Sequence, residues 1–268
     1  MKIVRFLDTS NRVVRGREHL DGTITRLDGE IFKELKDSGQ KIQVKKLLTP
    51  VTPTAILCIG LNYRQHAAET GSEIPRYPVL FMKNPGSVCH PQDPILLPKS
   101  CVDPPQVDYE GELAVVIGKP AKNVSESAAL DYVIGYTIGN DISARRWQKH
   151  AGGGQWIRGK SFDTFCPLGP RIVTSDELTD PQNLELKSFV NGEVMQNTNT
   201  GDMIFPVTKL LSYLSESTTL LPGTIIMTGT PGGVGYKRTP PVYLHPGDTV
   251  EVSIDCIGRL TNRVALEE

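Results

Sequence analysis

Short apolar runs, separated by turns rich in glycine and proline, dominate this chain. Runs of this length fit a pleated strand better than a helix, and the flanking glycine and proline residues mark turns. The segments predicted as strands are residues 1–7, 24–27, 55–59, 113–117, 132–138, 224–228 and 249–254. Asn191-Gly192 separates residues 184–190 from 193–196 and predicts a β-hairpin, because this dipeptide fits a type I′ turn.

Helical signals are fewer and shorter. The segments predicted as helices are residues 28–37, 63–70, 125–131, 143–150 and 207–214. Asn62 is placed to cap the N-terminus of the second of these segments, and Gly71 is placed to end it. Because strands outnumber helices and no regular alternation of strand and helix appears, we expect a strand-rich α+β fold with antiparallel or mixed sheet.

A proline-containing connector divides the chain. Residues 49–53 have the sequence Thr-Pro-Val-Thr-Pro, which is stiff because each proline fixes its own φ and restricts the residue before it. We therefore expect a small N-terminal α/β appendage over residues 1–50 and a main domain over residues 55–268. The 25 glycines and 20 prolines among 268 residues agree with a turn-rich fold.

Charge and cysteine usage narrow the class of protein. The 29 basic and 30 acidic residues give a net charge of −1, so no basic excess supports nucleic acid or an anionic membrane as a partner. No apolar run approaches the about 18 residues that span a bilayer. The five cysteines are scattered without a CxxC pair, which favours reduced thiols and argues against structural zinc. We expect a cytoplasmic protein, or one of the mitochondrial matrix if a presequence has been removed.

Three carboxylates form the first candidate site. Glu110 and Glu112 lie at the entrance of the strand at 113–117, and residues i and i+2 of an extended chain point to the same side. Neighbouring carboxylates repel unless they are protonated or bridged by a cation, and oxygen donors suit Mg²⁺, Mn²⁺ or Ca²⁺. Asp141 follows the strand at 132–138 and offers a third ligand. The alternatives are a solvated strand edge for the glutamates and a helix N-cap for Asp141.

His66 and Glu69 form the second candidate. They are spaced i, i+3 on a predicted helix, so Glu69 can accept a hydrogen bond from the imidazole and raise its basicity. The alternative is an exposed ion pair on a short helix. Lys160, between Gly159 and Ser161, could reach an anionic substrate as a point charge, or it could be a surface lysine. It follows a glycine triplet at residues 152–154 that predicts a flexible loop.

A glycine-rich segment at residues 229–235 comes directly after the strand at 224–228. Backbone N–H groups of such loops can approach an anion closely. The segment lacks the Gly-Lys-Ser/Thr sequence of a Walker A loop, and no βαβ unit surrounds it. A carboxylate-binding loop or a structural turn fits it better than a nucleotide site.

The order and the residue sequences of these motifs resemble those of the fumarylacetoacetate hydrolase family. The motifs are Gly60-Leu61-Asn62-Tyr63 with His66 and Glu69, residues 108–113, residues 140–145, residues 159–163 and residues 228–235. The resemblance covers residues 55–264 and is strongest to the domain-containing type 2 subgroup, which Trp147-Gln148 and residues 164–170 and 191–194 fit. It implies a mixed β-sandwich roll, usually a homodimer.

The resemblance also implies roles for nine side chains. The implied ligands of a divalent metal, Mg²⁺ or alternatively Mn²⁺ or Ca²⁺, are Glu110, Glu112 and Asp141. The implied catalytic residues are His66 and Glu69, on a lid helix that orders with substrate, and Lys160 beside the metal. The implied substrate-binding residues are Arg145, Gln148 and Thr230.

Substrates of the family are 2-oxo acids or β-dicarbonyl compounds, so the resemblance implies a metal-dependent enzyme that forms an enolate from a small 2-oxo dicarboxylate. Resemblance to the type 2 subgroup favours keto–enol tautomerisation of oxaloacetate. The alternatives are hydrolysis of a C–C bond in an acylpyruvate or fumarylacetoacetate-type substrate, and decarboxylation or isomerisation of a diacid. A catalytically silent dimeric scaffold is the alternative outside enzymes, and the intact set of site residues argues against it.

Overall fold

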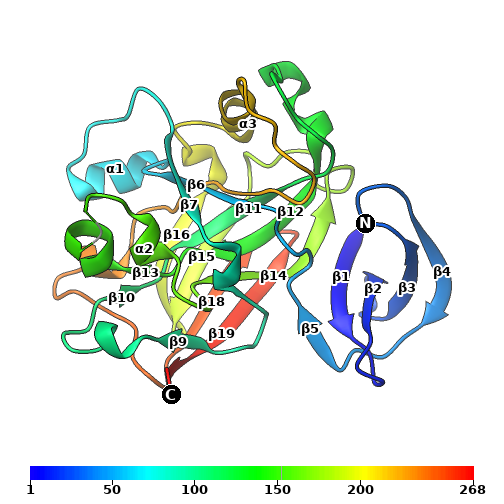
Figure 1. The fold of residues 1–268 in the computed structure, drawn as a ribbon, viewed down its shortest axis with the longest axis horizontal. Coiled ribbons are helices and arrows are strands. Elements are labelled where there is room, and N and C mark those ends of the chain that lie inside the picture. The colour runs from blue at the N-terminus through cyan, green and yellow to red at the C-terminus, as the bar shows by residue number, and fades with distance from the viewer. Residues whose placement is uncertain (152) are drawn as a thin grey trace.

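Two β-sheets contain most of the strands in the computed structural model, which describes residues 1–151 and 153–268 (Figure 1). The larger sheet has 12 strands, and its main path runs β4-β3-β2-β1-β14-β12-β11-β17-β6-β7. The second has five, in the order β16-β15-β18-β19-β9. Because β17 and β6 are parallel while most other pairs are antiparallel, the sheet is mixed, and the predicted strand-rich α+β class is confirmed. The flexible loop predicted at residues 152–154 lies partly outside the described residues.

The elements have the following bounds. Strands of the larger sheet are β1 (Lys2–Leu7), β2 (Val13–Glu18), β3 (Ile24–Gly29), β4 (Leu35–Lys41), β5 (Lys46–Leu48), β6 (Ile56–Gly60), β7 (Val79–Lys83), β8 (Val88–Cys89), β11 (Gly111–Ile117), β12 (Val133–Asn140), β14 (Cys166–Thr174) and β17 (Ile225–Met227). Strands of the second sheet are β9 (Ile95–Leu97), β15 (Glu185–Val190), β16 (Glu193–Asn199), β18 (Thr249–Ile254) and β19 (Gly258–Leu266), and β10 (Val107–Asp108) pairs with β13 (Ser143–Ala144). The α-helices are α1 (Arg64–Thr70), α2 (Ile157–Lys160) and α3 (Val207–Ser215). Trp147–Ala151 is a π-helix, and short 3₁₀ turns cover Pro85–Ser87, Lys99–Cys101, Glu126–Tyr132, Thr200–Asp202 and Gly235–Lys237.

The N-terminal segment is built from strands alone. The helix predicted at residues 28–37 is wrong, because this stretch contributes to the antiparallel pair β3 and β4, with Gly29 opposite Leu35. Gly29 has a φ of 106°, which a right-handed helix cannot contain. The appendage is therefore not α/β over residues 1–50. Strand β1 also pairs with β14, so β1 to β4, at one side of the main body in Figure 1, extend the larger sheet.

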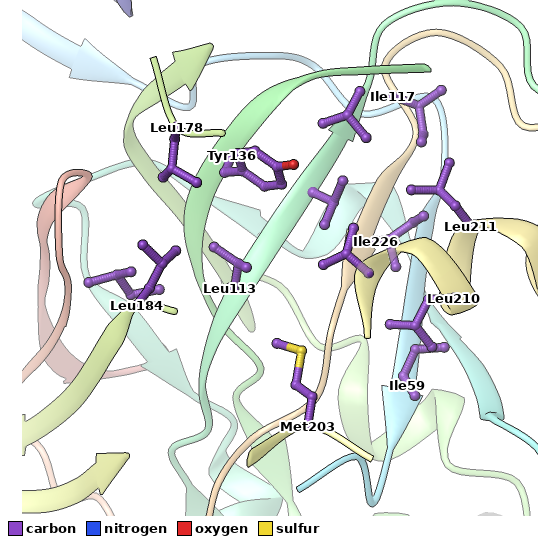
Figure 2. Close-up of a cluster of buried hydrophobic side chains, with 14 of the residues drawn as sticks. Ile59, Leu113, Ile117, Tyr136, Leu178, Leu184, Met203, Leu210, Leu211 and Ile226 are labelled. Carbon is purple, nitrogen blue, oxygen red and sulfur yellow. The ribbon is translucent and has the colours of Figure 1, made fainter. Parts of the chain in front are cut away.

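A large hydrophobic cluster lies where the larger sheet packs on α3 and on the second sheet, which contributes Leu186 of β15 and Val252 of β18. Figure 2 shows Leu113, Tyr136 and Ile226, from β11, β12 and β17, on the side of the sheet that faces Leu210 and Leu211 of α3. The apolar residues of α3 recur at helical spacing, which explains why this predicted helix is confirmed. Every residue of β11 is buried, since both faces of this central strand are covered. The strand that presents the candidate acids is therefore held rigidly.

Two local predictions need correction. The predicted α1 is present and ends at Gly71 in the left-handed conformation, but Asn62 does not cap it: Asp202 accepts the hydrogen bond from the backbone N–H of Gln65 at 3.0 Å. The helix predicted at residues 143–150 is wrong only at its start, because Ser143–Ala144 forms β13 against β10; the chain is helical from Arg145, with a π-helix over Trp147–Ala151.

The remaining local predictions agree better with the structure. The predicted hairpin of β15 and β16 is confirmed, with φ values of 52° and 82° at Asn191 and Gly192. The helix predicted at residues 125–131 is a 3₁₀ turn over Glu126–Tyr132. No helix of the described chain is long and apolar enough to cross a membrane.

Candidate active site

The three candidate carboxylates meet because of strand register. Strands β11 and β12 are antiparallel with Gly111 opposite Asn140, so Glu110 lies opposite Asp141. The backbone N–H of Asp141 donates to the carbonyl of Glu110 at 2.8 Å, and Asn140 Oδ1 accepts from the N–H of Glu110 at 3.0 Å. Carboxylate oxygens of Glu110, Glu112 and Asp141 lie within 4.8 Å of one another. All three residues are buried, which excludes the solvated strand edge, and β13 follows Asp141, which excludes the helix cap.

Three buried cations surround these carboxylates. Lys160 Nζ donates to Glu110 at 2.8 Å and to Asp141 at 2.5 Å. Lys83 Nζ donates to the other oxygen of Asp141 at 2.6 Å. An Arg145 Nη1–Glu110 contact of 2.6 Å completes the set. Glu112 differs from the other two, because no described lysine or arginine lies within ion-pair distance of it; its carboxylate accepts instead from the N–H of Gly229 at 2.8 Å.

The pKa values of these groups follow from burial and neighbouring charge. Burial alone would raise the pKa of Glu110, but Lys160 and Arg145 outweigh it and hold the pKa well below its usual range. Burial raises the pKa of Glu112, and the negative charges of Asp141 and Glu110 raise it further. Burial opposes the charge of Lys160, yet Asp141 and Glu110 raise its pKa, so this lysine is cationic at neutral pH. The three carboxylates and the three cations are equal in number, but the cations pair with Glu110 and Asp141, and Glu112 is left without a cation within ion-pair distance.

This donor set suits a hard divalent cation. Three buried carboxylates that converge on one point supply only oxygen ligands, which Mg²⁺, Mn²⁺ and Ca²⁺ prefer. Glu112, which no described lysine or arginine pairs, gives the electrostatic reason: a cation close to its carboxylate lowers the cost of keeping that side chain ionised. Glu110, Glu112 and Asp141 can therefore hold such an ion.

Lys160 reaches the carboxylates because a glycine precedes it. A Cβ at Gly159 would lie 2.4 Å from the backbone nitrogen of Gln148, so only glycine allows α2 to pack this closely on the π-helix. Gln148 Oε1 accepts from Arg145 at 3.1 Å, and no described residue accepts a hydrogen bond from its Nε2. The two helical segments thus bring Lys160, Arg145 and Gln148 together.

Asp108 organises the loop beside the acids. Its carboxylate accepts two hydrogen bonds from Arg145, at 2.9 and 2.7 Å, and further hydrogen bonds from the backbone N–H groups of Gly235 at 2.8 Å and Tyr236 at 3.0 Å. The buried pair therefore fixes both the guanidinium and the end of the glycine-rich segment. Charge-assisted bonds of this kind are stronger than neutral ones. Arg145 is consequently held between Asp108 and Glu110.

The glycine-rich segment is tied to β11 through two side chains. Thr230 Oγ1 donates to the carbonyl of Gly111 at 3.1 Å and accepts from Gln196 Nε2 at 2.7 Å. Gln196 Oε1 in turn accepts from the N–H of Gly111 at 2.9 Å. The single hydroxyl proton of Thr230 is thus already used by Gly111, so a substrate carboxylate at this residue would need the hydroxyl to turn.

Replacing Gly229 by alanine is expected to damage this loop. Gly229 has a φ of 99°, and a Cβ there would lie 2.7 Å from Cβ of Asn62, which is buried and bonded to the carbonyl groups of Phe205 and Thr228. We expect a loss of about 2–4 kcal/mol in the free energy of unfolding, measured by urea denaturation. Alanine at Gly247, which has a φ of 97° but open space around it, is the control for backbone strain alone. Equal losses in the two variants would show that the contact with Asn62 is unimportant.

Helix α1 lies over the cavity and carries the second candidate pair. His66 Nδ1 is 3.2 Å from Glu69 Oε2, and Glu69 Oε1 accepts from the N–H of Gly233 at 3.0 Å. Burial opposes the ionisation of Glu69, but the hydrogen bonds from His66 and Gly233 prevail and lower its pKa. His66 is only 7% exposed whereas the side chain of Glu69 is 27% exposed, so the pair combines a buried imidazole with a carboxylate that reaches solvent. Glu69 links the helix to the glycine-rich segment.

A cavity of about 460 Å³ joins these elements. Six of the nine predicted site residues line it: His66, Glu110, Arg145, Gln148, Lys160 and Thr230. Glu112 and Asp141 do not line the cavity but lie behind Glu110, within the carboxylate cluster. Ile59, Val79, Phe81 and Trp156 give one wall an apolar character. The arrangement is a small polar cavity with a charged floor.

Sequence reasoning missed Lys83 and assigned no role to Asp108. Strand β7 alternates between the exposed Leu80 and Met82 and the buried Phe81 and Lys83. A lysine at an inward-facing position of an alternating strand is rarely buried without a partner, and this is the signal that could have revealed Lys83. The sequence around Asp108 gives a weaker indication of its role. Its hydrogen-bond partners, Arg145 and the backbone N–H groups of Gly235 and Tyr236, come from distant parts of the sequence.

The fold and the cavity define a class: a strand-rich domain with a small polar cavity beside a carboxylate cluster that can hold a hard cation. The chain belongs to the fumarylacetoacetate hydrolase family, because the family model described as fumarylacetoacetate (FAA) hydrolase C-terminal matches residues 55–265. The resemblance inferred from the motifs is thereby confirmed.

Individual relatives agree with this membership. The chain is 46% identical over 236 residues to the mitochondrial oxaloacetate tautomerase fahd2 of Xenopus laevis, covering 87% of this chain and 73% of the relative. A solved structure of a 2-hydroxyhepta-2,4-diene-1,7-dioate isomerase from Mycobacterium marinum is 38% identical with a TM-score of 0.84, covering 100% of this chain and 99% of that one. A fumarylacetoacetate hydrolase from Exiguobacterium antarcticum is 36% identical with a TM-score of 0.87, covering 100% of both chains.

Proposed function

We propose that this protein is a metal-dependent enzyme that forms the enolate of a small 2-oxo dicarboxylate, and that its reaction is keto–enol tautomerisation of oxaloacetate. The substrate follows from the frog relative, which is named as an oxaloacetate tautomerase. The observation that carries the proposal is one cavity, lined by Lys160, by the Glu69-paired His66 and by Glu110, that lies directly against the buried carboxylate cluster to which Glu110 belongs. These are the parts that proton transfer next to a carbonyl group requires.

Glu110, Glu112 and Asp141 would hold the metal, with Mg²⁺ as our choice and Mn²⁺ or Ca²⁺ as alternatives. When bound, the ion supplies Lewis acidity that favours negative charge on the oxygens of the 2-oxo acid. Lys160 adds to this stabilisation, because an ammonium group has three donors and the two carboxylates use only two of them. Its third N–H is free to donate to a substrate oxygen in the cavity.

His66 is the group that we assign to proton transfer at C3. Donation from Nδ1 to Glu69 leaves the lone pair on Nε2, so the imidazole can accept a proton. The ionised Glu69 then stabilises the imidazolium. Return of this proton to C3 gives the keto form, and protonation of the C2 oxygen gives the enol. Trp156 and Phe81 contribute the apolar wall that limits the access of water to this exchange.

One assay tests the proposal directly. Purified protein with Mg²⁺ is given oxaloacetate with and without a chelator, while enol absorbance and pyruvate formation are followed together. Faster enol decay that requires the metal and releases no pyruvate supports tautomerisation. Release of pyruvate would replace it with decarboxylation. If neither signal changes, acylpyruvates are the next substrates, and failure with those would favour a catalytically silent scaffold.

Replacing His66 by glutamine is expected to lower kcat by about 10²–10⁴-fold, because the base is removed while a polar side chain of similar length remains. The affinity for Mg²⁺, measured by calorimetry, should stay within twofold of wild type, since His66 is not in the carboxylate cluster. Glutamine at His150, an exposed residue without a role in the site, is the control. Unchanged turnover in the His66 variant would reduce the pair to a structural contact.

The proposal also covers the oligomeric state and the cellular compartment of the protein. We expect a homodimer, supported by the edge strand β7, on which Leu80 and Met82 are 48% and 40% exposed. Apolar edges of this kind are usually covered. All five cysteines are free, which suits a reducing compartment, either the cytoplasm or the mitochondrial matrix named for the frog relative.

A further inference from the structure

The mouth of the cavity carries two lysines that the mechanism does not use. Lys149 and Lys237 line the same cavity as Lys160, but Lys149 is exposed and Lys237 is half-buried, whereas Lys160 is fully buried. Lys149 belongs to the π-helix and Lys237 to the 3₁₀ turn that ends the glycine-rich segment. This difference in burial places the two lysines nearer to solvent than the carboxylate cluster.

The positively charged side chains at the mouth of the cavity lie around the ring of Tyr236. Lys149 Nζ lies 3.9 Å and Lys237 Nζ 5.6 Å from the centroid of the Tyr236 ring, and the guanidinium carbon of Arg145 lies at 4.3 Å. Three cations therefore surround one aromatic ring. Burial lowers the pKa of Lys149, and the neighbouring charges of Arg145 and Lys237 lower it further, which shows that positive charge accumulates there. Contact with the ring offsets only part of this repulsion.

No carboxylate of the described residues pairs with the two lysines. Within the described residues, neither Lys149 nor Lys237 has a carboxylate within ion-pair distance. The acids that act on them electrostatically are used elsewhere: Asp108 by Arg145, Glu69 by His66 and the N–H of Gly233, and Glu110 by Arg145 and Lys160. An anionic ligand is the group that would complete this end of the cavity.

We propose that Lys149 and Lys237 bind the distal carboxylate of the substrate and thereby select 2-oxo dicarboxylates over 2-oxo monocarboxylates. The inference rests on the proposed function, which places the 2-oxo carboxylate end beside the carboxylate cluster and Lys160 at the floor. The second carboxylate then points towards the mouth, where the two lysines meet it. Arg145 contributes charge there but is itself held by Asp108 and Glu110.

The test compares two ligands that differ only at the distal end. Oxaloacetate and 2-oxobutyrate share a four-carbon 2-oxo acid skeleton, but only oxaloacetate carries the second carboxylate. Calorimetry in the presence of Mg²⁺ measures the affinity of both for wild type and for the double variant Lys149→Met, Lys237→Met. We expect wild type to prefer oxaloacetate, and the variant to lose about tenfold in affinity for oxaloacetate and none for 2-oxobutyrate.

A matched control separates charge at the mouth from charge in general. Lys119→Met removes another exposed lysine that lies over a tyrosine, 4.7 Å from the ring of Tyr132, and should change neither affinity. Equal affinity of wild type for the two ligands, or an equal loss for both in the double variant, would overturn the inference. Turnover of oxaloacetate by wild type is scored separately: if it is absent while the affinities behave as expected, the proposed reaction fails and the dicarboxylate subsite stands.

Discussion

Replacing Glu112 by glutamine is expected to lower Mg²⁺-dependent turnover by about 10³-fold or more while leaving the metal-free protein at least as stable as wild type. The first effect follows from the loss of one of three converging carboxylates. The second follows from the raised pKa of Glu112, whose causes are burial and then the charges of Asp141 and Glu110. When the pKa of a carboxyl group is higher in the folded than in the unfolded protein, the folded state loses stability as the pH rises above the pKa of the unfolded chain. At neutral pH an uncharged isostere therefore removes a destabilising contribution to the free energy of folding.

Thermal unfolding with and without Mg²⁺ checks both effects at once. Wild type should gain thermal stability with the ion, since an ion that binds only the folded state stabilises it. The Glu112→Gln variant should start at an equal or higher melting temperature without metal and gain little on its addition. Glutamine at Glu193, an exposed residue of β16, should behave like wild type. A normal response to Mg²⁺ in the Glu112 variant would remove this residue from the metal site.

Replacing Lys160 by methionine is expected to separate catalysis from metal binding. Turnover should fall by about 10³-fold, because the third N–H of this lysine is the one that we assign to the substrate oxygen. The affinity for Mg²⁺ should stay equal or increase, since the ammonium group competes with a cation for Glu110 and Asp141. Without metal the variant should be destabilised by about 3–5 kcal/mol, because two buried carboxylates lose a common partner.

On the same preparation, single-turnover kinetics measure the turnover, and titration and scanning calorimetry measure the affinity for Mg²⁺ and the stability without metal. Methionine at Lys209, which forms an exposed ion pair with Glu126 at 2.9 Å, is the matched control and should alter stability by less than about 1 kcal/mol. Parallel losses of metal affinity and turnover in the Lys160 variant would mean that the lysine only holds the carboxylates in place.

Local patterns predicted the parts of the site that depend on neighbours in sequence. Glu110 and Glu112 are two residues apart, and His66 and Glu69 are three apart on a helix, so the geometry of an extended strand and of a helical turn places each pair together. Lys83 was missed because its partner, Asp141, lies just after another strand, β12, and the alternation along β7 indicates only that Lys83 faces inward, not which acid it meets.

For the fold, as for the site, local patterns predicted what depends on neighbouring residues and missed what depends on pairing between distant segments. The strands β6, β11 and β18 were predicted from apolar runs, whereas β14 was missed although it is central and pairs with both β1 and β12. Its prolines, Pro167 and Pro170, are residues that sheet interiors normally exclude, so the sequence of this strand reads as a loop. The N-terminal helix was predicted wrongly because pairing with β3 satisfies the backbone of residues 35–41 in a way that local propensity does not reveal.

The sequence by itself determined the family, the strand-rich class and the identity of the chemical groups, because these depend on residue types and on spacings of a few positions. The tertiary structure alone decided how the groups combine. The register of β11 on β12 brings Asp141 to Glu110, and packing of α2 on the π-helix at Gly159 brings Lys160 to both. The physical reason is that charge balance in a buried site depends on distances across strands, which only the assembled sheet defines.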